Sequence, residues 1–207
     1  MAYNRASDEM FLEAAIKTVA KVGVENTRTK DIAEYTGFSE ASMYRRFPTK
    51  EILLREAFLY IDNRLSSILT QSALIRQNGS VSFEEGLYDT WKKIFRYLIK
   101  HREETIFLIR YRYSSLYTDE VRSRRQAYTG GLDRVYEAFV KHFGKTAHSD
   151  RGFLLSYIFE MTLCFAEKII AGKLEDSEET ENNIWLAVGS AVQSWARRQS
   201  EKNKNER

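Results

Sequence analysis

Apolar residues recur at helical spacing along most of the chain, and this periodicity limits the fold more than any other feature. Between Phe11 and Val19, for example, apolar residues return every three or four positions and form one face of a helix. No stretch shows the alternation of apolar and polar residues that a half-buried strand requires. The 207 residues include one proline and ten glycines, whereas a β-sandwich or barrel of this size needs more turn residues. The pattern therefore predicts an all-α protein.

The composition is that of an ordinary globular protein with one or two domains. Hydrophobic residues make up 43% of the chain and charged residues 29%, and the net charge is only +3. Overall charge therefore does not indicate nucleic-acid binding, and any such function must rest on local arrangement. Cys164 is the only cysteine, which excludes an intrachain disulfide and indicates a reducing compartment. The first ten residues lack an apolar core, so we expect no signal peptide.

Capping residues, glycines and the single proline divide the apolar pattern into about nine helices. A serine precedes several of them, and Ser82 with Glu85 forms a capping box. Asn78 and Gly79 predict a turn. The sequence predicts helices between Ser7 and Gly23, Thr29 and Thr36, Ser39 and Pro48, Lys50 and Gln77, Ser82 and Leu98, Arg102 and Tyr117, Gly131 and Gly144, Ser149 and Gly172, and Ser177 and Ser200.

The last two predicted helices are the most apolar part of the chain. The stretch between Ser149 and Gly172 is apolar on two opposite sides, which indicates a helix that is buried on both. A membrane span is the alternative, but Glu160, Glu167 and Lys168 disfavour it because central charges cost about 2.5 to 3.5 kcal/mol each. We expect helices this apolar to pair with a second copy of the chain. The predicted dimer interface consists of Phe159, Leu163, Ala166, Ile184, Val188, Ala191 and Trp195.

Residues 27–54 carry the pattern of a helix-turn-helix. Ile32 and Ala33 are followed by Gly37 and then by Met43, so that a small residue lets two helices approach and a glycine takes the turn between them. The second helix of such a pair fits the major groove of DNA, which is wide enough to admit it. We expect Ile32, Met43 and Phe47 to lie in the core of this region.

This region resembles the TetR family of bacterial transcriptional regulators. The resemblance covers roughly the first quarter of the chain, and beyond it only the layout of helices, with two long apolar ones at the end, is similar. The residues that carry the resemblance are Phe11 to Gly23, Thr27, Asp31-Ile32-Ala33, Gly37-Phe38-Ser39, Met43-Tyr44, Phe47-Pro48-Thr49-Lys50 and Leu53.

The resemblance implies a helix-turn-helix DNA-binding domain at residues 1–50 and a helical ligand-binding and dimerisation domain at 51–200. The polar composition of residues 201–207 predicts a disordered tail. It implies a protein of the bacterial cytoplasm that is associated with the nucleoid when bound to DNA. The function we expect is that of a repressor, which binds a palindromic operator as a dimer and is released by a small lipophilic or aromatic effector. The alternatives are an activator, or a helical DNA-binding or protein-interaction module without an effector.

The candidate DNA contacts fall into two groups, one for the DNA backbone and one for the bases. The resemblance implies that phosphates are bound by Tyr44, Thr49 and Lys50. Thr27 lies just before the second helix, where its hydroxyl and free backbone N–H groups can also meet a phosphate. The residues placed to read base edges are Lys30, Glu40, Ala41, Ser42, Arg45 and Arg46.

Several of these residues have a plainer alternative role. Thr49 can cap a helix, and Arg45 and Arg46 can belong to a solvated face. Lys30 and Arg46 can each contact the DNA backbone instead of a base. Glu40 stands where the family commonly has lysine, and it can either accept a hydrogen bond from cytosine or stabilise the start of a helix. Ala41 and Arg46 also differ from the residues frequent in the family. These departures leave the operator sequence open.

Aromatic residues are frequent in the middle of the chain, where they can line a pocket for an aromatic or lipophilic ligand. Packing in an ordinary core is the alternative for most of them, and Arg110 can face solvent or form an ion pair. Glu160 can hold a cationic ligand, or pair with a basic residue of a neighbouring helix. The candidate pocket residues are Trp91, Phe95, Phe107, Arg110, Tyr111, Tyr113, Tyr136, Tyr157, Glu160 and Met161.

No arrangement of residues points to catalysis. His101, His142 and His148 are scattered without the spacing of metal ligands, and the sequence has no glycine-rich phosphate loop. It indicates no combination of serine or cysteine with histidine and a carboxylate either. We therefore expect a protein that is not an enzyme, with no catalytic residues, no metal and no cofactor.

Overall fold

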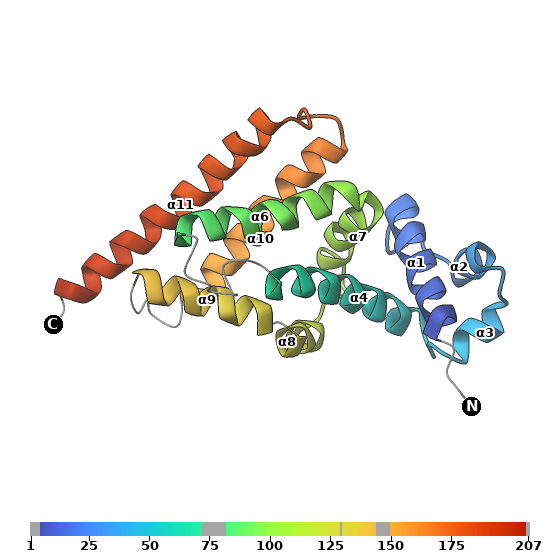
Figure 1. Ribbon diagram of the computed structural model, residues 1–207. Helices are drawn as coiled ribbons and strands as arrows, with labels where there is room; N and C mark the ends of the chain where they lie inside the picture. Colours follow the sequence, from blue (N-terminus) through green and yellow to red (C-terminus); the bar gives the residue numbers. More distant parts are fainter. Residues whose placement is uncertain (1–4, 72–81, 129, 144–149, 206–207) are drawn as a thin grey trace. The chain divides into compact units, whose positions relative to one another are not determined.

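The structure, a computed structural model, describes residues 5–71, 82–128, 130–143 and 150–205 (Figure 1). Over these residues the chain forms ten α-helices and no strands, which confirms the all-α prediction. The helices are α1 (Arg5–Val22), α2 (Thr29–Thr36), α3 (Glu40–Tyr44), α4 (Lys50–Thr70), α6 (Phe83–Lys100), α7 (Arg102–Arg112), α8 (Asp119–Tyr128), α9 (Gly130–Phe143), α10 (Asp150–Ile170) and α11 (Glu178–Asn205).

Helix α8 is absent from the sequence prediction, which instead extends the preceding helix to Tyr117. In the structure α7 ends at Arg112, and α8 follows as a separate helix. Its ten residues include few apolar ones, so periodicity does not reveal it, although Val121 is buried. The usable signal is Thr118 followed by two acidic residues, because its Oγ1 accepts a hydrogen bond from the Val121 N–H (3.5 Å) and so begins the helix.

Elsewhere the predicted helix starts agree with the structure, and the differences lie at the ends. The predicted capping box is confirmed, since the Ser82 N–H donates to Glu85 Oε2 (3.0 Å) and the Glu85 N–H donates to Ser82 Oγ (3.2 Å). Helix α3 ends at Tyr44, before the predicted limit at Pro48. The structure describes α4 to Thr70, and the predicted turn at residues 78–79 lies outside the described residues.

At the other end of the chain, α11 continues to Asn205, through most of the segment 201–207 for which we expect a disordered tail. Glutamate and lysine are frequent in this segment, and both residues have good helix propensity. A polar composition is therefore compatible with a continued helix that has no apolar face to bury.

By its contacts the chain divides into two compact units, which comprise residues 1–64 with 101–128 and residues 65–100 with 129–207. In the first unit α1 packs along α7 and against α2, and α2 contacts α3. In the second unit α6 packs on α10, and α11 contacts both α10 and α9. Helix α4 contributes residues to both units.

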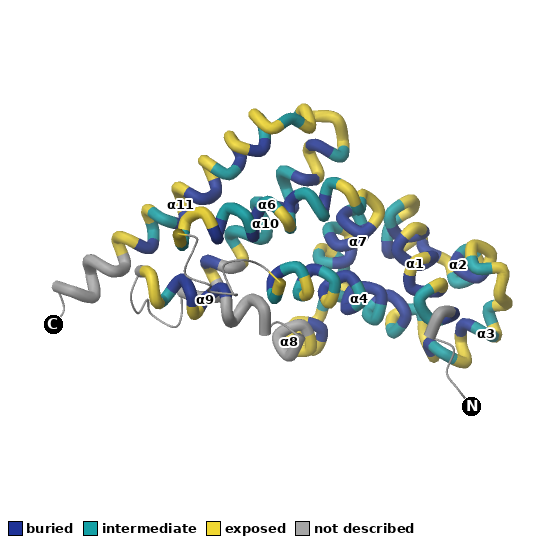
Figure 2. Tube along the Cα trace, in the orientation of Figure 1, coloured by how far each residue is buried: buried dark blue, intermediate teal, exposed yellow. Residues whose placement is uncertain are grey.

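The core of the first unit gathers large apolar side chains from α1, α2, α3, α4 and α7, whose buried segments are dark blue in Figure 2. Phe58 of α4 stacks on Tyr111 of α7, with ring centroids 5.1 Å apart. The largest side chains of this core that are fully buried are Phe11, Ile32, Met43, Leu53, Leu54, Phe58, Ile61, Phe107, Leu108 and Tyr111.

The core of the second unit forms around α6, α9, α10 and α11. One cluster joins the end of α4 to α6 and α9, and a second joins α9 and α10 to α11. None of the described helices is long and apolar enough to cross a membrane. The buried residues of the two clusters are Leu69, Leu87, Val135, Ala138, Phe139, Leu154, Val192 and Ala196.

Candidate nucleic-acid interface

The turn between α2 and α3 has the geometry of a helix-turn-helix. Gly37 ends α2 in a left-handed conformation (φ 71°), and its N–H donates to the Glu34 carbonyl (3.3 Å). No atom lies within 4 Å of the place that a Cβ would take, so glycine is required here for its backbone conformation and not for space. Ser39 then caps α3, because its Oγ accepts a hydrogen bond from the Ser42 N–H (3.2 Å).

Buried apolar side chains hold these two helices to α1. We call residues 5–50 the head. Ile32, Met43 and Phe47 are buried in it, as predicted. The ring of Phe11 on α1 meets the Phe47 ring edge-on, with centroids 6.4 Å apart, and lies 5.6 Å from the Phe38 ring. Helix α3 thus buries one side in this core and leaves the other side to solvent.

Tyr44, the last residue of α3, lies at the surface beside the first residue of α2. It is 43% exposed, and its hydroxyl donates to Thr29 Oγ1 (3.2 Å). The Thr29 hydroxyl in turn donates to Glu40 Oε1 (2.5 Å), so that a chain of hydrogen bonds joins the starts of α2 and α3. The sequence analysis did not include Thr29 among the candidate contacts. The only signal for it is a hydroxyl residue at the first position of α2.

Thr27 is not placed to bind a phosphate through its hydroxyl, which corrects the prediction. The residue is only 2% exposed, and its Oγ1 donates to the Gly23 carbonyl (2.6 Å). Its role is to close the loop after α1. The half-buried Lys50 donates from Nζ to the Thr27 carbonyl (3.3 Å), which ties the start of α4 to the same loop.

Thr49 caps α4, the alternative role that we considered for it. Its Oγ1 accepts a hydrogen bond from the Ile52 N–H (3.2 Å). The pKa of the Glu51 carboxyl lies below its usual value, first because its own backbone N–H donates to it and next because the Thr49 hydroxyl does. Thr49 is also exposed, so capping does not hide it from a DNA backbone.

Four of the six candidate base-reading residues, Lys30, Ala41, Ser42 and Arg45, lie at or near the surface of the head. Arg45 donates from Nη2 to Ser42 Oγ (2.9 Å), which directs its guanidinium along α3. Lys30 lies 3.9 Å from Glu34 on the next turn of α2, and both side chains are mostly exposed. Such an exposed pair holds the lysine only weakly, because water screens the charges.

The other two candidates, Glu40 and Arg46, make contacts inside the head. Glu40 is the first residue of α3 and accepts the Thr29 hydrogen bond, so its position agrees with that of an acid at a helix start. Arg46 forms an ion pair with Asp8 in the first turn of α1, and both side chains are about three-quarters buried. This pair ties the end of α3 to the start of α1.

The structure divides the candidate pocket residues between the two units. In the first unit Phe107 and Tyr111 are core residues that stack on each other (5.6 Å), and burial raises the pKa of Tyr111 to about 12. Arg110 donates from Nη1 to the Val19 carbonyl in the last turn of α1 (2.9 Å). Tyr113 is 79% exposed, which corrects its assignment to an enclosed pocket. Core packing is thus the better description of Phe107 and Tyr111, whereas Arg110 and Tyr113 are exposed.

In the second unit the candidates lie on α6, α9 and α10. Trp91 stacks on Phe95 (4.8 Å), and its Nε1 donates to Thr162 Oγ1 on α10 (3.0 Å). Trp185 of α11 lies 5.2 Å from the Trp91 ring. Tyr136 of α9 is buried, whereas the candidates on α10 are half-buried. These last are Tyr157, Glu160 and Met161.

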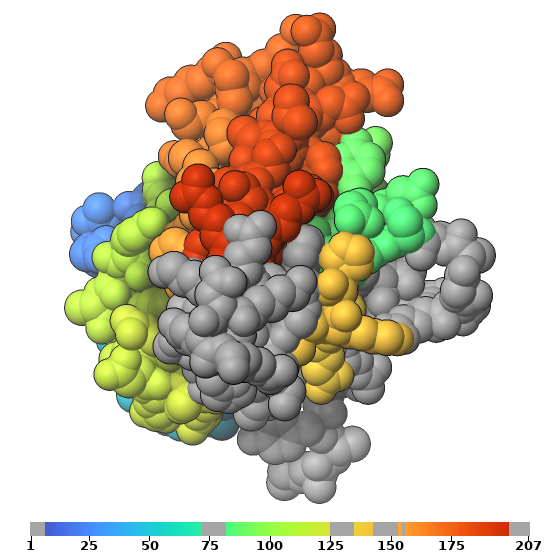
Figure 3. All heavy atoms as spheres, turned by 90° about the vertical axis from the view of Figure 1, so that its left-hand side faces the viewer, coloured from blue at the N-terminus to red at the C-terminus, as the bar shows by residue number. Residues whose placement is uncertain are grey.

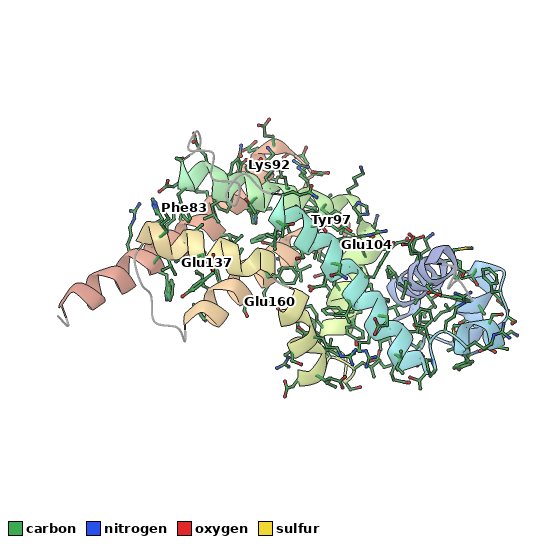
Figure 4. The ribbon with its side chains drawn as sticks, turned by 60° about the horizontal axis from the view of Figure 1, so that its bottom comes forward. Phe83, Lys92, Tyr97, Glu104, Glu137 and Glu160 are labelled. Carbon is green, nitrogen blue, oxygen red and sulfur yellow. The ribbon has the colours of Figure 1, made fainter. Side chains whose placement is uncertain are left out.

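A buried carboxylate anchors the start of α11 to α6, and the sequence analysis did not find it. Glu181 is 1% exposed and accepts a hydrogen bond from Lys92 Nζ (2.7 Å), which is labelled on α6 in Figure 4. Arg96 pairs with the same carboxylate and with Asp176 (2.6 Å). The hydrogen bond to Glu181 raises the pKa of Lys92. No local pattern reveals such a pair, because its members are far apart in the sequence.

Most of the predicted dimer residues are already buried within one chain. Leu163, Ala166, Ile184 and Val188 are buried, Phe159 and Trp195 are half-buried, and Ala191 is exposed. The four buried residues cannot also face a second copy. Periodicity detects that α10 and α11 are apolar on two sides but does not say which side the chain itself covers.

Three features define a helix-turn-helix DNA-binding protein. They are the turn at Gly37, the buried side chains that hold α2 and α3 to α1, and the exposed side of α3. Comparison with known proteins shows which family this region resembles. Residues 11–57 match the model of the bacterial regulatory proteins of the tetR family. Over this region the chain is similar to the tetR family of regulators, as the sequence resemblance implies.

A curated relative is similar to part of the chain, and several solved structures share its fold. The chain is 34% identical over 68 residues to the uncharacterized HTH-type transcriptional regulator YvkB of Bacillus subtilis (strain 168). That match covers 33% of this chain and 36% of the relative, so the chain spans about a third of the relative's length there.

The solved structures share the fold over nearly the whole chain. A TetR family transcription regulator from Marinobacter aquaeolei VT8 is 23% identical, with a TM-score of 0.75 over 91% of this chain and 94% of that one. A putative family member from Shewanella sp. PV-4 is 17% identical, with a TM-score of 0.75 over 90% and 98%. The fatty acid degradation regulator FadR from Bacillus halodurans is 16% identical, with a TM-score of 0.66 over 87% and 97%.

Proposed function

We propose that this TetR-family regulator is a repressor, which binds a palindromic operator as a dimer and is released by a small lipophilic or aromatic effector. It acts in the bacterial cytoplasm and at the nucleoid. The observation that carries the proposal is α3, which packs on a buried core on one side and on the other presents Tyr44, with Arg45 directly after it, to solvent. Two such helices, about 34–36 Å apart, would enter successive major grooves on one face of DNA.

The contacts divide by what each side chain can reach. Tyr44, Thr49 and Lys50 serve the phosphates, and Thr27 supports them from the loop behind. Base edges are read by exposed or half-exposed side chains of α2 and α3, with Arg45 the main reader, because a bidentate arginine–guanine contact is worth about 1–3 kcal/mol of discrimination. The readers are Lys30, Ala41, Ser42 and Arg45.

The dimer forms through the side of α11 that the chain itself leaves uncovered. Leu186 is a large apolar residue that is 66% exposed, and small residues adjoin it on the same side of the helix. Side chains of α11 also lie at the surface of the face drawn in Figure 3. Covering this apolar side would remove Leu186 from water. The proposed contact residues are Leu186, Ala187, Ser190, Ala191 and Ser194.

The effector binds in the second unit, next to the aromatic stack of α6. Trp91 and Phe95 offer flat apolar faces, and Glu160 on the adjoining α10 adds a carboxylate. The structurally similar FadR from Bacillus halodurans is a fatty acid degradation regulator, and this likeness supports a lipophilic ligand in our proposal. The candidate residues that we retain are Trp91, Phe95, Tyr136, Tyr157, Glu160 and Met161.

The test is selection of DNA from a random pool by the purified protein, followed by sequencing of the retained molecules. A palindromic consensus is expected. Arg45→Ala should relax the preference at one base position in each half-site, whereas the exposed Arg198→Ala on α11 should leave the consensus unchanged. Enrichment of no sequence by a folded protein would contradict the proposal.

A further inference from the structure

The hydrogen-bonded chain Tyr44–Thr29–Glu40 lies among the proposed DNA contacts, but its middle member has no part in them. Thr29 Oγ1 accepts a hydrogen bond from the Tyr44 hydroxyl (3.2 Å) and donates one to Glu40 Oε1 (2.5 Å). The three side chains come from the starts of α2 and α3 and from the end of α3. The contact between Thr29 and Glu40 is therefore a direct bridge between the two helices of the motif.

The direction of these hydrogen bonds follows from the chemistry of their ends. A glutamate carboxylate is ionised at neutral pH and can only accept. Thr29 has one hydroxyl proton and gives it to Glu40, so that Thr29 has only lone pairs to offer Tyr44. Tyr44 must then donate its own proton to Thr29. In the free protein the Tyr44 oxygen consequently offers a phosphate lone pairs and no proton.

We infer that Glu40 is a brake on DNA binding rather than a base reader. It acts in two ways, because its negative charge repels the phosphates and its hydrogen bond to Thr29 keeps the Tyr44 proton inside the protein. Both effects lower the affinity for every DNA sequence by the same factor. This inference rests on the proposed function, since it takes Tyr44 to be a phosphate contact.

The place of Glu40 explains why the family-typical lysine can be replaced here. An acid in the first turn of a helix is stabilised by the unpaired backbone N–H groups, and the Thr29 hydroxyl adds a further donor. The head can thus keep a carboxylate on its DNA-facing helix without a basic partner. The cost falls on DNA affinity and not on the fold.

Two substitutions separate the charge from the hydrogen bond. Glu40→Gln removes the charge but keeps an oxygen that can accept from Thr29. Thr29→Val keeps the charge and shape but releases the Tyr44 hydroxyl. Glu103→Gln on α7 is the matched control, because it makes the same change in net charge at an exposed position outside the head.

The measurement is the affinity for a fluorescent mixed-sequence duplex, long enough for two half-sites, at several salt concentrations. Sequence-independent binding needs no knowledge of the operator. Glu40→Gln should tighten binding by roughly threefold to tenfold at low salt, and less at high salt. Thr29→Val should also tighten it, and this gain should vanish in the Tyr44→Phe background. Glu103→Gln should change the affinity by less than about twofold.

Three results would overturn the inference. Equal gains from Glu40→Gln and Glu103→Gln would reduce the effect to net charge. A change of preference at one base position, with unchanged affinity for mixed sequence, would make Glu40 a base reader. Failure of the folded wild-type chain to bind any duplex, even at low salt, would remove the proposed function itself and the inference with it.

Discussion

The head and α11 bury apolar side chains in different ways. Helices α2 and α3 are eight and five residues long, and each has one narrow side to bury, against Phe11 and its neighbours. Helix α11 has 28 residues and apolar side chains on more than one side, of which Ile184 is covered by the chain and Leu186 is not. A short helix therefore has one possible packing, whereas a long helix keeps a second apolar side for another partner.

We expect the largest loss of stability from damage to the core of the head. Phe11→Ala removes a fully buried ring that contacts two other aromatic rings, and should lower the free energy of unfolding by about 3–5 kcal/mol. Urea unfolding followed by circular dichroism measures it. The control is Tyr35→Ala, an exposed site on α2, which should cost less than about 0.5 kcal/mol. Equal effects at the two sites would mean that the head does not depend on this core.

The two sides of α11 can be separated next. Ile184→Ala on the covered side should lower the free energy of unfolding by about 2–5 kcal/mol, because it leaves a cavity. Leu186→Glu on the uncovered side should keep the helix content and dissociate the proposed dimer, as measured by sedimentation velocity. Unfolding of the chain by Leu186→Glu, or a dimer that survives it, would contradict the assignment of this side to the dimer.

A smaller effect is expected at Gly189, which lies on the covered side of α11. A Cβ at this position would stand 2.9 Å from the ring of Trp185, one turn earlier. Gly189→Ala should therefore displace that indole from its neighbour Trp91, at a cost of about 1–3 kcal/mol. A changed tryptophan fluorescence spectrum is the readout, with the exposed Ser190→Ala as the control. An unchanged spectrum would show that the indole yields without leaving the stack.

The smallest effect concerns the cap of α4. Thr49→Ala should lower the free energy of unfolding by about 1 kcal/mol at neutral pH. The pKa of Glu51 is lowered in the folded chain, so its contribution is present above about pH 4.3 and is lost as the pH falls through the folded value. The difference between wild type and variant should therefore shrink in acid, as a pH series of urea unfolding would reveal. A difference that stays constant would exclude Glu51 from the cap.

Features of the head that depend on neighbouring residues could be predicted from the sequence. Gly37 and Ser39 specify the turn by their own backbone and capping preferences, and the spacing of Ile32, Met43 and Phe47 specifies what is buried. The resemblance to the family adds which exposed residues are candidates for DNA contact. Their role in DNA binding stays a prediction.

Features that join distant parts of the chain could not be predicted. Asp8 and Arg46 are 38 positions apart, and nothing in either neighbourhood names the other as its partner. The same holds for Lys92 and Glu181. Thr29 and Glu40 are only 11 positions apart, but their contact depends on how the turn sets one helix on the other. A sequence pattern can indicate that a charged side chain needs a partner. Which residue that partner is depends on how the helices pack.

The two arginines that grip α1 give that helix a mechanical role. Arg46 holds Asp8 near one end, and Arg110 of α7 holds the Val19 carbonyl near the other. These points are about 17 Å apart along the helix axis, and an α-helix hardly changes its length. Helix α1 is thus held near each end by an arginine from another part of the first unit. Through these two contacts α1 links α7 to the residues that follow α3, although α1 itself makes no contact with DNA in our proposal.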